Sequence, residues 1–479
     1  MGSLVRGLQR AGADSGFRLS LQGKPVFSGR FTVRHLGSSG WKSYTSYHYK
    51  FVLIHYCCDM LSELSIGLEG FMRLGSIATG TDFYDRETEC EDLWRYLENE
   101  HVVASGPRRL GKSSIVNRLR EQAIAKGLLA QHVDVQGVEG AQAFVDQLSA
   151  HFPDESVTGY LKGLGQTAEQ WFSKVKKVGL KVPGGFGADI ELQAAASQPW
   201  YKSATVLQAR LTGVPALIFI DEFSVFLEKL LLRDQKEAEA LLAWLRAWRV
   251  KPGVACRFLF TGSIGLNALL AKYSLSAQFN DCHEYPIGPF KPTTARNMVQ
   301  KFAEEENYLI SADTATHLCQ RVGWLSPYYL CLLLDQAQQA ARDRIEESQS
   351  PTLPTTSNEP IKISEITATD VDNAYERLLS ARSRFIHWEE RIKRDLVSLD
   401  LGFANLVLTA LAKNQNGLTQ RQLHARLAKL EPDPDARAPR LQAIFGKLQE
   451  EGYISPADAT GRVKFLSFLL RDYWARNHV

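Results

Sequence analysis

The sequence predicts an α/β fold: a parallel sheet flanked by helices, followed by an all-α segment and a small helical domain at the C-terminus. Three observations lead to this prediction. A glycine-rich loop at 106–114 stands between an apolar run and a helical pattern; the apolar run 216–220 ends in two carboxylates; and strand-like and helix-like segments alternate from 85 to 265. Such alternation is typical of a parallel sheet with helices on both faces.

The composition is that of a globular protein. The 479 residues suffice for two to four domains, and the net charge of +3 is so close to balance that any nucleic-acid surface must be a local patch. The seven cysteines include the adjacent pair Cys57-Cys58 but no CxxC spacing, which argues against zinc and a secreted disulfide scaffold and predicts a cytoplasmic location. No apolar run approaches the roughly 18 residues of a membrane span, so we expect no membrane partner.

The pattern divides the chain into six parts. Residues 1–71 are rich in Ser, Gly and aromatic residues and show no sustained helical or strand period; one hypothesis is that Met72 is the true start, and the alternative is a mobile arm. We expect the remainder to form a core domain at 72–290, a helical lid at 291–345, a linker at 346–365, a helical segment at 366–400 and a winged helix at 401–479. The helical pattern within 366–400 covers 369–395.

The core domain begins with a predicted helix over 85–98, a strand at 101–105, a helix over 113–125, a strand at 129–136 and another helix from 140. An insertion at about 172–193 shows two short alternating runs around Pro183-Gly184-Gly185, which predicts a hairpin. This hairpin either contacts an acidic partner through nearby lysines or covers the sheet edge as a flap.

The loop GPRRLGKSS has the spacing G-x-x-x-x-G-K-[ST] of a phosphate-binding loop. Glycines let backbone N–H groups point inward at phosphate oxygens, Lys112 can reach the β- and γ-phosphates, and the Ser113 hydroxyl can ligate Mg²⁺. A strand before the loop and a helix after it are the context that the motif requires. The predicted phosphate-binding residues are Gly106, Pro107, Arg108, Arg109, Leu110, Gly111, Lys112, Ser113 and Ser114.

The run ALIFI at 216–220 is typical of a central strand buried on both faces, and Asp221 and Glu222 follow at its carboxyl end, where α/β sheets bind ligands. Asp221 would hold Mg²⁺, directly or through water, and Glu222 would orient or deprotonate the attacking water. The alternative is that the two acids only cap the helix that follows.

A third strand, 257–265, ends in Thr261-Gly262-Ser263, where a small hydroxyl is placed to sense a γ-phosphate. The alternative is that this hydroxyl caps the next helix.

The segments GPRRLGKSS, ALIFIDE and FTGSIG, in this order, resemble the AAA+-related STAND P-loop ATPases, especially the archaeal-type branch and its bacterial relatives. The resemblance covers roughly 80–479. It implies a P-loop NTPase fold, ATP and Mg²⁺ as cofactors, and Glu222, Lys112 and Ser263 as catalytic residues. The family's sensor strand often ends in arginine, whereas here it ends in Ser263.

Two further segments carry the resemblance. FYDRETECEDLW resembles the segment before the family's P-loop, which implies that Phe83, Tyr84 and Arg86 approach the adenine. GWLSPYYL at 323–330 resembles the Gly…Pro-Tyr motif of the family's helical lid, which implies that Pro327 packs by the nucleotide.

The C-terminal rhythm of three helices and a two-stranded turn predicts a winged helix. Residues 401–479 hold 11 Lys and Arg against 7 Asp and Glu. The basic residues singled out on the third helix and the wing are Arg437, Arg440, Lys447, Arg462 and Lys464. The partner is either duplex DNA or a protein surface.

Two function classes follow. The first is an ATP-driven switch in which ATP with Mg²⁺ holds lid and core closed, hydrolysis releases them, and the winged helix or a separate partner responds to the difference. The second is an ATP-gated DNA-binding protein of the origin-recognition or helicase-loader kind, working as a homo-oligomer with Arg246 or Arg249 as an arginine finger. A nucleotide-binding scaffold without useful hydrolysis is a third reading, which Glu222 argues against.

Overall fold

The computed structural model describes residues 18–22, 30–37, 40–46, 77–162, 198–263, 265–348, 364–381 and 401–478, together with 385–386, 388–390 and 392–393. The chain divides into two compact units, Met1–Phe71 and Met72–Val479. The predicted hairpin at 172–193 lies outside the described residues.

The first unit contains an antiparallel sheet of three strands in the order β1-β2-β3. They are β1 (Arg18–Gln22), β2 (Arg30–Gly37) and β3 (Gly40–Ser46). The expectation that this segment has no strand pattern is wrong for these residues. Their apolar positions are interrupted by charged and hydroxyl residues, which hides the two-residue period of a strand.

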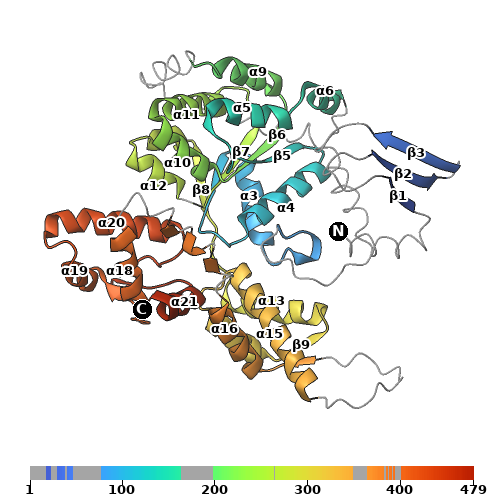
Figure 1. Ribbon diagram of the computed structural model, residues 1–479. Coiled ribbons are helices and arrows are strands. Elements are labelled where there is room, and N and C mark those ends of the chain that lie inside the picture. The colour runs from blue at the N-terminus through green and yellow to red at the C-terminus, as the bar shows by residue number, and fades with distance from the viewer. Residues whose placement is uncertain are drawn as a thin grey trace. The chain divides into compact units, whose positions relative to one another are not determined.

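A parallel five-stranded sheet organises the second unit, in the order β5-β6-β7-β4-β8 (Figure 1). Its strands are β4 (His101–Ser105), β5 (Leu129–Asp134), β6 (Ala216–Asp221), β7 (Arg257–Thr261) and β8 (Cys282–Pro286). The strand β8 could not be predicted from the sequence, because its residues CHEYP are mostly polar. Since β7 separates β4 from β6, the glycine-rich loop and the two carboxylates follow non-adjacent strands.

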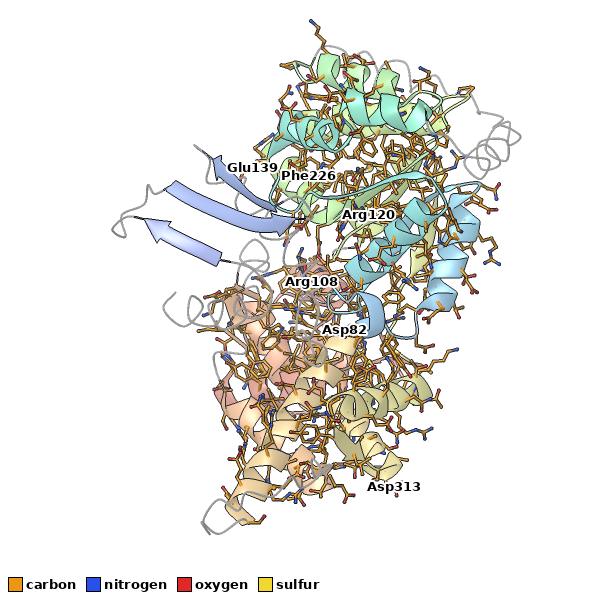
Figure 2. All side chains as sticks on the ribbon, turned by 90° about the vertical axis from the view of Figure 1, so that its right-hand side faces the viewer. Asp82, Arg108, Arg120, Glu139, Phe226 and Asp313 are labelled. Carbon is orange, nitrogen blue, oxygen red and sulfur yellow. The ribbon has the colours of Figure 1, made fainter. Side chains whose placement is uncertain are left out.

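Helices cover both faces of this sheet, and side chains of β6 alternate between them. Leu217 and Phe219 join the core that contains α3 (Glu87–Leu97) and α4 (Lys112–Ala125). Ile218 and Ile220 join the opposite core, where Figure 2 shows Phe226 among closely packed side chains. The helices of that core are α5 (Gly140–His151), α9 (Tyr201–Leu211), α10 (Phe223–Arg233) and α11 (Gln235–Val250).

Shorter elements complete this α/β layer. They are the 3-10 turns η1 (Gly80–Asp82) and η2 (Ser276–Phe279) and the helices α6 (Asp154–Lys162) and α12 (Leu266–Lys272).

A region that we call the lid region follows. Its helices are α13 (Pro292–Glu305), α14 (Ala312–Val322), α15 (Pro327–Ser348) and α16 (Ala368–Ser380), and a short parallel ladder joins β9 (Tyr308–Ile310) to β10 (Ser364–Ile366). The helical pattern predicted over 369–395 is not continuous, because α16 ends at Ser380 and Ala381 leaves the helical conformation with ψ of 78°.

The C-terminal region, as we call 401–478, consists of α18 (Leu401–Ala412), α19 (Gln420–Leu427), α20 (Pro434–Glu450) and α21 (Phe468–His478). The two-residue strands β11 (Leu418–Thr419) and β12 (Arg462–Val463) pair antiparallel between them. In the part of the chain that the structure describes, no helix is both long and apolar enough to cross a bilayer.

Candidate functional site

The glycine-rich loop turns from β4 into α4 through two backbone positions that require glycine. Gly111, the N-cap of α4, has φ of 84°. At Gly106, with φ of 153°, a Cβ would lie 2.5 Å from the carbonyl oxygen of Ile287. The loop therefore keeps its curve only with glycine at both ends.

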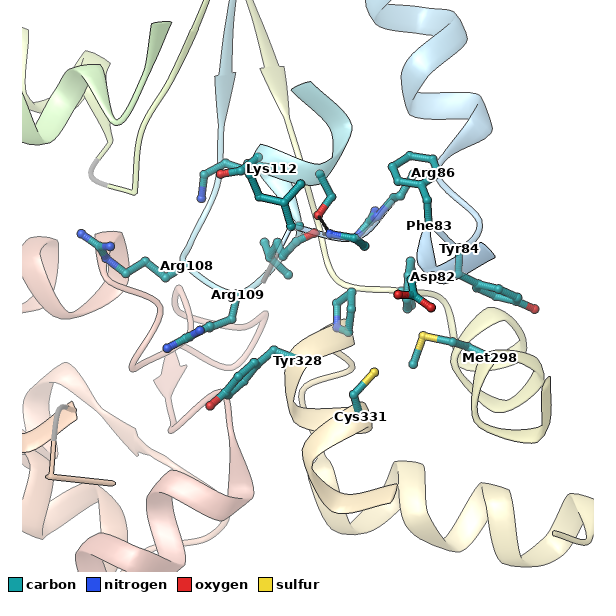
Figure 3. Close-up of a pocket in the computed structure, with 18 of the residues that line it drawn as sticks. Asp82, Phe83, Tyr84, Arg86, Arg108, Arg109, Lys112, Met298, Tyr328 and Cys331 are labelled. Carbon is teal, nitrogen blue, oxygen red and sulfur yellow. Dashed lines mark hydrogen bonds between the residues drawn. The ribbon is translucent and has the colours of Figure 1, made fainter. Parts of the chain in front are cut away.

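Lys112 fills the loop from inside. Its Nζ donates to the carbonyl oxygens of Gly106 at 2.7 Å and Pro107 at 2.8 Å. Figure 3 shows the Lys112 side chain among the residues that line the pocket. The pKa of Lys112 is lowered to about 8. Burial is the main cause and the Arg108 charge acts in the same direction, whereas Glu222 and Asp221 oppose the shift. The loop therefore holds this ammonium where phosphates would lie.

Because the pKa of Lys112 is lowered, we expect nucleotide binding to depend on pH. Only the protonated amine attracts phosphate, and a bound phosphate would raise the pKa of Lys112 again. Affinity for ATP should therefore fall as the pH rises through about 8, by about tenfold between pH 7 and pH 9. Titration calorimetry across this range checks the slope; a constant affinity would contradict it.

Asp221 lies buried at the end of β6 with several hydrogen bonds. Burial alone would raise the pKa of its carboxyl, but hydrogen bonds with His132, Thr261 and Ser113 outweigh this effect and lower the pKa to about 2. His132 Nε2 is 3.1 Å from Asp221 Oδ2. His132 could not be singled out from the sequence, because only the pairing of β5 with β6 brings it beside Asp221. Asp221 is ionised at any physiological pH.

Ser113 and Asp221, the two residues predicted to hold Mg²⁺, are brought together by the fold. Ser113 lies close enough to Asp221 to lower the pKa of that carboxyl, although the two lie in different elements. A hydroxyl beside an ionised carboxylate is the oxygen-donor set that Mg²⁺ prefers, alongside waters and phosphate oxygens. The residues present therefore fit a magnesium ion.

Glu222 has the left-handed backbone conformation, with φ of 56° and ψ of 30°. This conformation costs a non-glycine residue about 1 kcal/mol. Its Oε2 accepts hydrogen bonds from the Ser263 hydroxyl at 2.8 Å and the Ser263 backbone N–H at 3.2 Å. Its Oε1 lies 3.5 Å from the Arg108 guanidinium.

Arg108 connects the loop to the C-terminal region. Its Nε is 3.5 Å from Oε2 of Glu451, whose side chain is only 2% exposed. A second ion pair flanks this contact, because Lys447 Nζ lies 2.9 Å from Oε1 of Glu228 on α10. Gly452 packs so closely on Pro107 that a Cβ would lie 2.5 Å from the proline Cβ.

A cavity of about 370 Å³ extends from the loop toward the lid region. Of the predicted nucleotide-binding residues, Phe83, Tyr84, Arg86, 108–114 and Pro327 line it, as does Glu222, whereas Gly106, Pro107, Asp221 and Ser263 do not. Residues missed from the sequence that line it are Ile77, Ala78, Asp82, Phe290, Met298, Phe302, Tyr328 and Cys331. Most of these are apolar side chains, whose pocket role no local motif reveals.

Arg86 and Arg109 brace the loop. Arg86 donates to the carbonyl oxygens of Leu110 and Gly288, and its guanidinium lies 4.5 Å from the centre of the Phe290 ring. Arg109 has φ of 71°, and its guanidinium lies 4.1 Å from the centre of the Tyr328 ring of the lid region. Both arginines thus link the loop to the segments around it.

Two alternatives from the sequence are wrong. Ser263 does not cap the next helix, because α12 has Gly265 as N-cap without a side-chain hydrogen bond. Arg249 cannot act as an arginine finger in this conformation, because it is 2% exposed and its Nε donates to Asp281 Oδ2 at 2.7 Å. Arg246 is less buried, and its guanidinium donates to Asn280 Oδ1 at 3.2 Å.

The basic residues predicted to face a partner on α20 are engaged within the chain. Arg437 is buried and donates to the carbonyl oxygens of Glu431 and Pro432. Arg440 pairs with Glu431 at 2.8 Å, and Lys447 with Glu228.

No protein-family model matches the sequence, and no curated protein matches it. Among solved structures, the chain is similar to the Walker-type ATPase PABY2304 of Pyrococcus abyssi, with a TM-score of 0.54 and 16% identity over 82% of this chain and 96% of that one. Two others are the ORC2 protein of Aeropyrum pernix (TM-score 0.44, 13% identity, 82% and 93% covered) and the RuvB branch migration motor of Thermotoga maritima (0.37, 12%, 80% and 93%). The likeness to the Pyrococcus protein confirms the predicted α/β P-loop fold with a helical C-terminal part.

Proposed function

We propose that the protein is an ATP-binding and slowly ATP-hydrolysing molecular switch of the STAND/AAA+ type. In this proposal Mg-ATP controls how the lid region and the C-terminal region, a winged helix, are arranged. The observation that carries the proposal is the position of Arg108, whose guanidinium lies 3.5 Å from Glu222 and 3.5 Å from Glu451. Arginine binds phosphate strongly, so a nucleotide in the loop would compete with Glu451 for Arg108.

The roles of the site residues follow from their positions. Lys112 and the loop N–H groups bind the phosphates, and Ser113 with Asp221 holds Mg²⁺, which neutralises charge on the phosphates when bound. Glu222 orients or deprotonates the attacking water. The adenine of the nucleotide occupies the apolar end of the cavity, which Phe83 and Tyr84 line.

The experiment that tests the switch compares the size of the full chain by small-angle scattering without nucleotide, with Mg-ADP and with Mg-ATP. We expect the radius of gyration to increase with Mg-ATP, because nucleotide withdraws Arg108 from Glu451 and weakens the docking of the C-terminal region. An identical scattering curve in all three states would overturn the switch even if nucleotide binds.

Replacing Glu451 by glutamine should have the same effect without nucleotide. Glu451 is the buried acid between Arg108 and Lys447, which lie 3.5 and 3.9 Å from it, so glutamine removes the charge that attracts both cations to the end of α20. We expect Glu451→Gln to show an increased radius of gyration in the absence of ATP. The matched control is Asp435→Asn, which removes an exposed acid at the other end of α20 and should leave the scattering unchanged.

The second candidate function is ATP-gated DNA binding, which one set of side chains favours. Arg421, Arg426 and Lys429, on or next to α19, are exposed. Within the described residues no acidic side chain forms an ion pair with them. Retention of duplex DNA that depends on ATP and weakens with salt would support this function. Size analysis with ATP but no DNA separates it from nucleotide-dependent homo-oligomerisation.

A further inference from the structure

Both oxygens of the Glu222 carboxylate face donors in this conformation. Oε2 accepts from the hydroxyl and the backbone N–H of Ser263, at 2.8 and 3.2 Å, and Oε1 lies 3.5 Å from Arg108. A carboxylate has about four lone-pair positions, so the two hydrogen bonds from Ser263 take up those of Oε2, while Arg108 faces Oε1. Glu222 lines the cavity, yet its oxygens are engaged beside it.

Ser263 is fixed firmly in the position from which it makes this contact. It is 1% exposed and does not line the cavity. The preceding Gly262 lies so close to α10 that a Cβ there would be 1.9 Å from the Ser224 hydroxyl oxygen. The end of β7 is therefore pressed against the start of α10, where Glu222 is the N-cap.

We propose that Ser263 is a positioning residue that holds Glu222 away from the attacking water, instead of sensing the γ-phosphate. This inference rests on the proposed ATPase function. In that reaction the water oxygen bonds to the γ-phosphorus, the bond from phosphorus to the ADP oxygen breaks with its electron pair, and Glu222 accepts the water proton. Hydrolysis then requires Glu222 to leave Ser263 first.

Arg108 links this restraint to the C-terminal region. The same guanidinium faces Glu222 on one side and the buried Glu451 on the other. A nucleotide that withdraws Arg108 from Glu451 also draws it away from Glu222, and the contact with Ser263 then remains as the restraint on Glu222.

The test is the steady-state rate of Ser263→Ala, which removes the hydroxyl and keeps the backbone bond. We expect kcat to rise about tenfold with KM for ATP unchanged, because a hydrogen bond to a charged group has been lost from the state in which Glu222 is held. Ser263→Thr keeps the hydroxyl and should turn over at the parent rate. A γ-phosphate sensor predicts the opposite sign, so a lower or unchanged kcat in Ser263→Ala would overturn the inference.

Two further measurements separate this inference from the proposed function. The double variant Ser263→Ala/Glu222→Gln should be as slow as Glu222→Gln alone, since the gain acts through Glu222; a gain that survives would overturn the inference. Binding of a fluorescent ATP analogue to the parent is measured first. A parent that binds ATP but shows no gain in Ser263→Ala overturns only the inference, whereas a parent that binds no nucleotide overturns the proposed function as well.

Discussion

Replacing Lys112 by alanine is expected to abolish ATP binding. The Lys112 amine lies among the loop carbonyls of Gly106 and Pro107, inside the loop that would hold the β- and γ-phosphates. Charge-assisted hydrogen bonds to phosphate are about twice as strong as neutral ones. We expect a loss of affinity of about a hundredfold or more, equivalent to about 3 kcal/mol, in titration calorimetry with Mg-ATP.

The matched control for this variant is Lys229→Ala. Lys229 is exposed on α10, and its Nζ donates to the carbonyl oxygen of Gln136, outside the cavity. It should bind ATP like the parent. Because Lys112 is buried and its removal relieves a desolvated charge, the variant should also fold, which circular dichroism verifies. A Lys112→Ala variant that binds like the parent would show that the loop is not the nucleotide site.

Replacing Glu222 by glutamine is expected to stop hydrolysis while ATP binding persists. Glutamine keeps the size of the side chain and can still accept hydrogen bonds from Ser263, but it cannot take a proton from water. General-base catalysis contributes about a hundredfold to ten-thousandfold, so we expect kcat to fall by at least about a hundredfold. Phosphate release under saturating Mg-ATP measures this change.

The comparison variant is Glu121→Gln on α4, an acid whose side chain is 42% exposed and pairs with Arg118 outside the cavity. It should hydrolyse ATP at the parent rate. If Glu222→Gln retains the parent rate, Glu222 does not act on the water, and its contact with Ser263 is structural.

Local patterns were sufficient where chemistry and backbone geometry coincide. The loop at 106–114 was predictable because its glycines are required at fixed positions, and β6 because an unbroken apolar run must be buried on both faces. By contrast, β8 is short and polar, so only its pairing with β4 makes it a strand. His132 and the apolar cavity residues carry no local signal, because their role depends on neighbours that are remote in sequence.

In the C-terminal region, too, the helices were predictable from the sequence but the side-chain contacts were not. Its helices follow from apolar spacing and capping residues such as Thr419, which forms a capping box with Gln422. The sequence does not predict the direction in which the charged side chains of this region point. Arg437 and Lys447 read as partner-facing positions, but the fold turns them toward Glu431, Pro432 and Glu228.

The sequence by itself determined the α/β P-loop fold, the loop that would hold phosphate and the acids that follow β6, because short-range spacing dictates backbone geometry. Only the tertiary structure decided that β7 lies between β4 and β6, that Ser263 holds Glu222, and that Arg108 meets Glu451. These contacts join residues from separate elements, and their formation depends on how whole faces of helices and strands bury their apolar side chains, which no local pattern encodes.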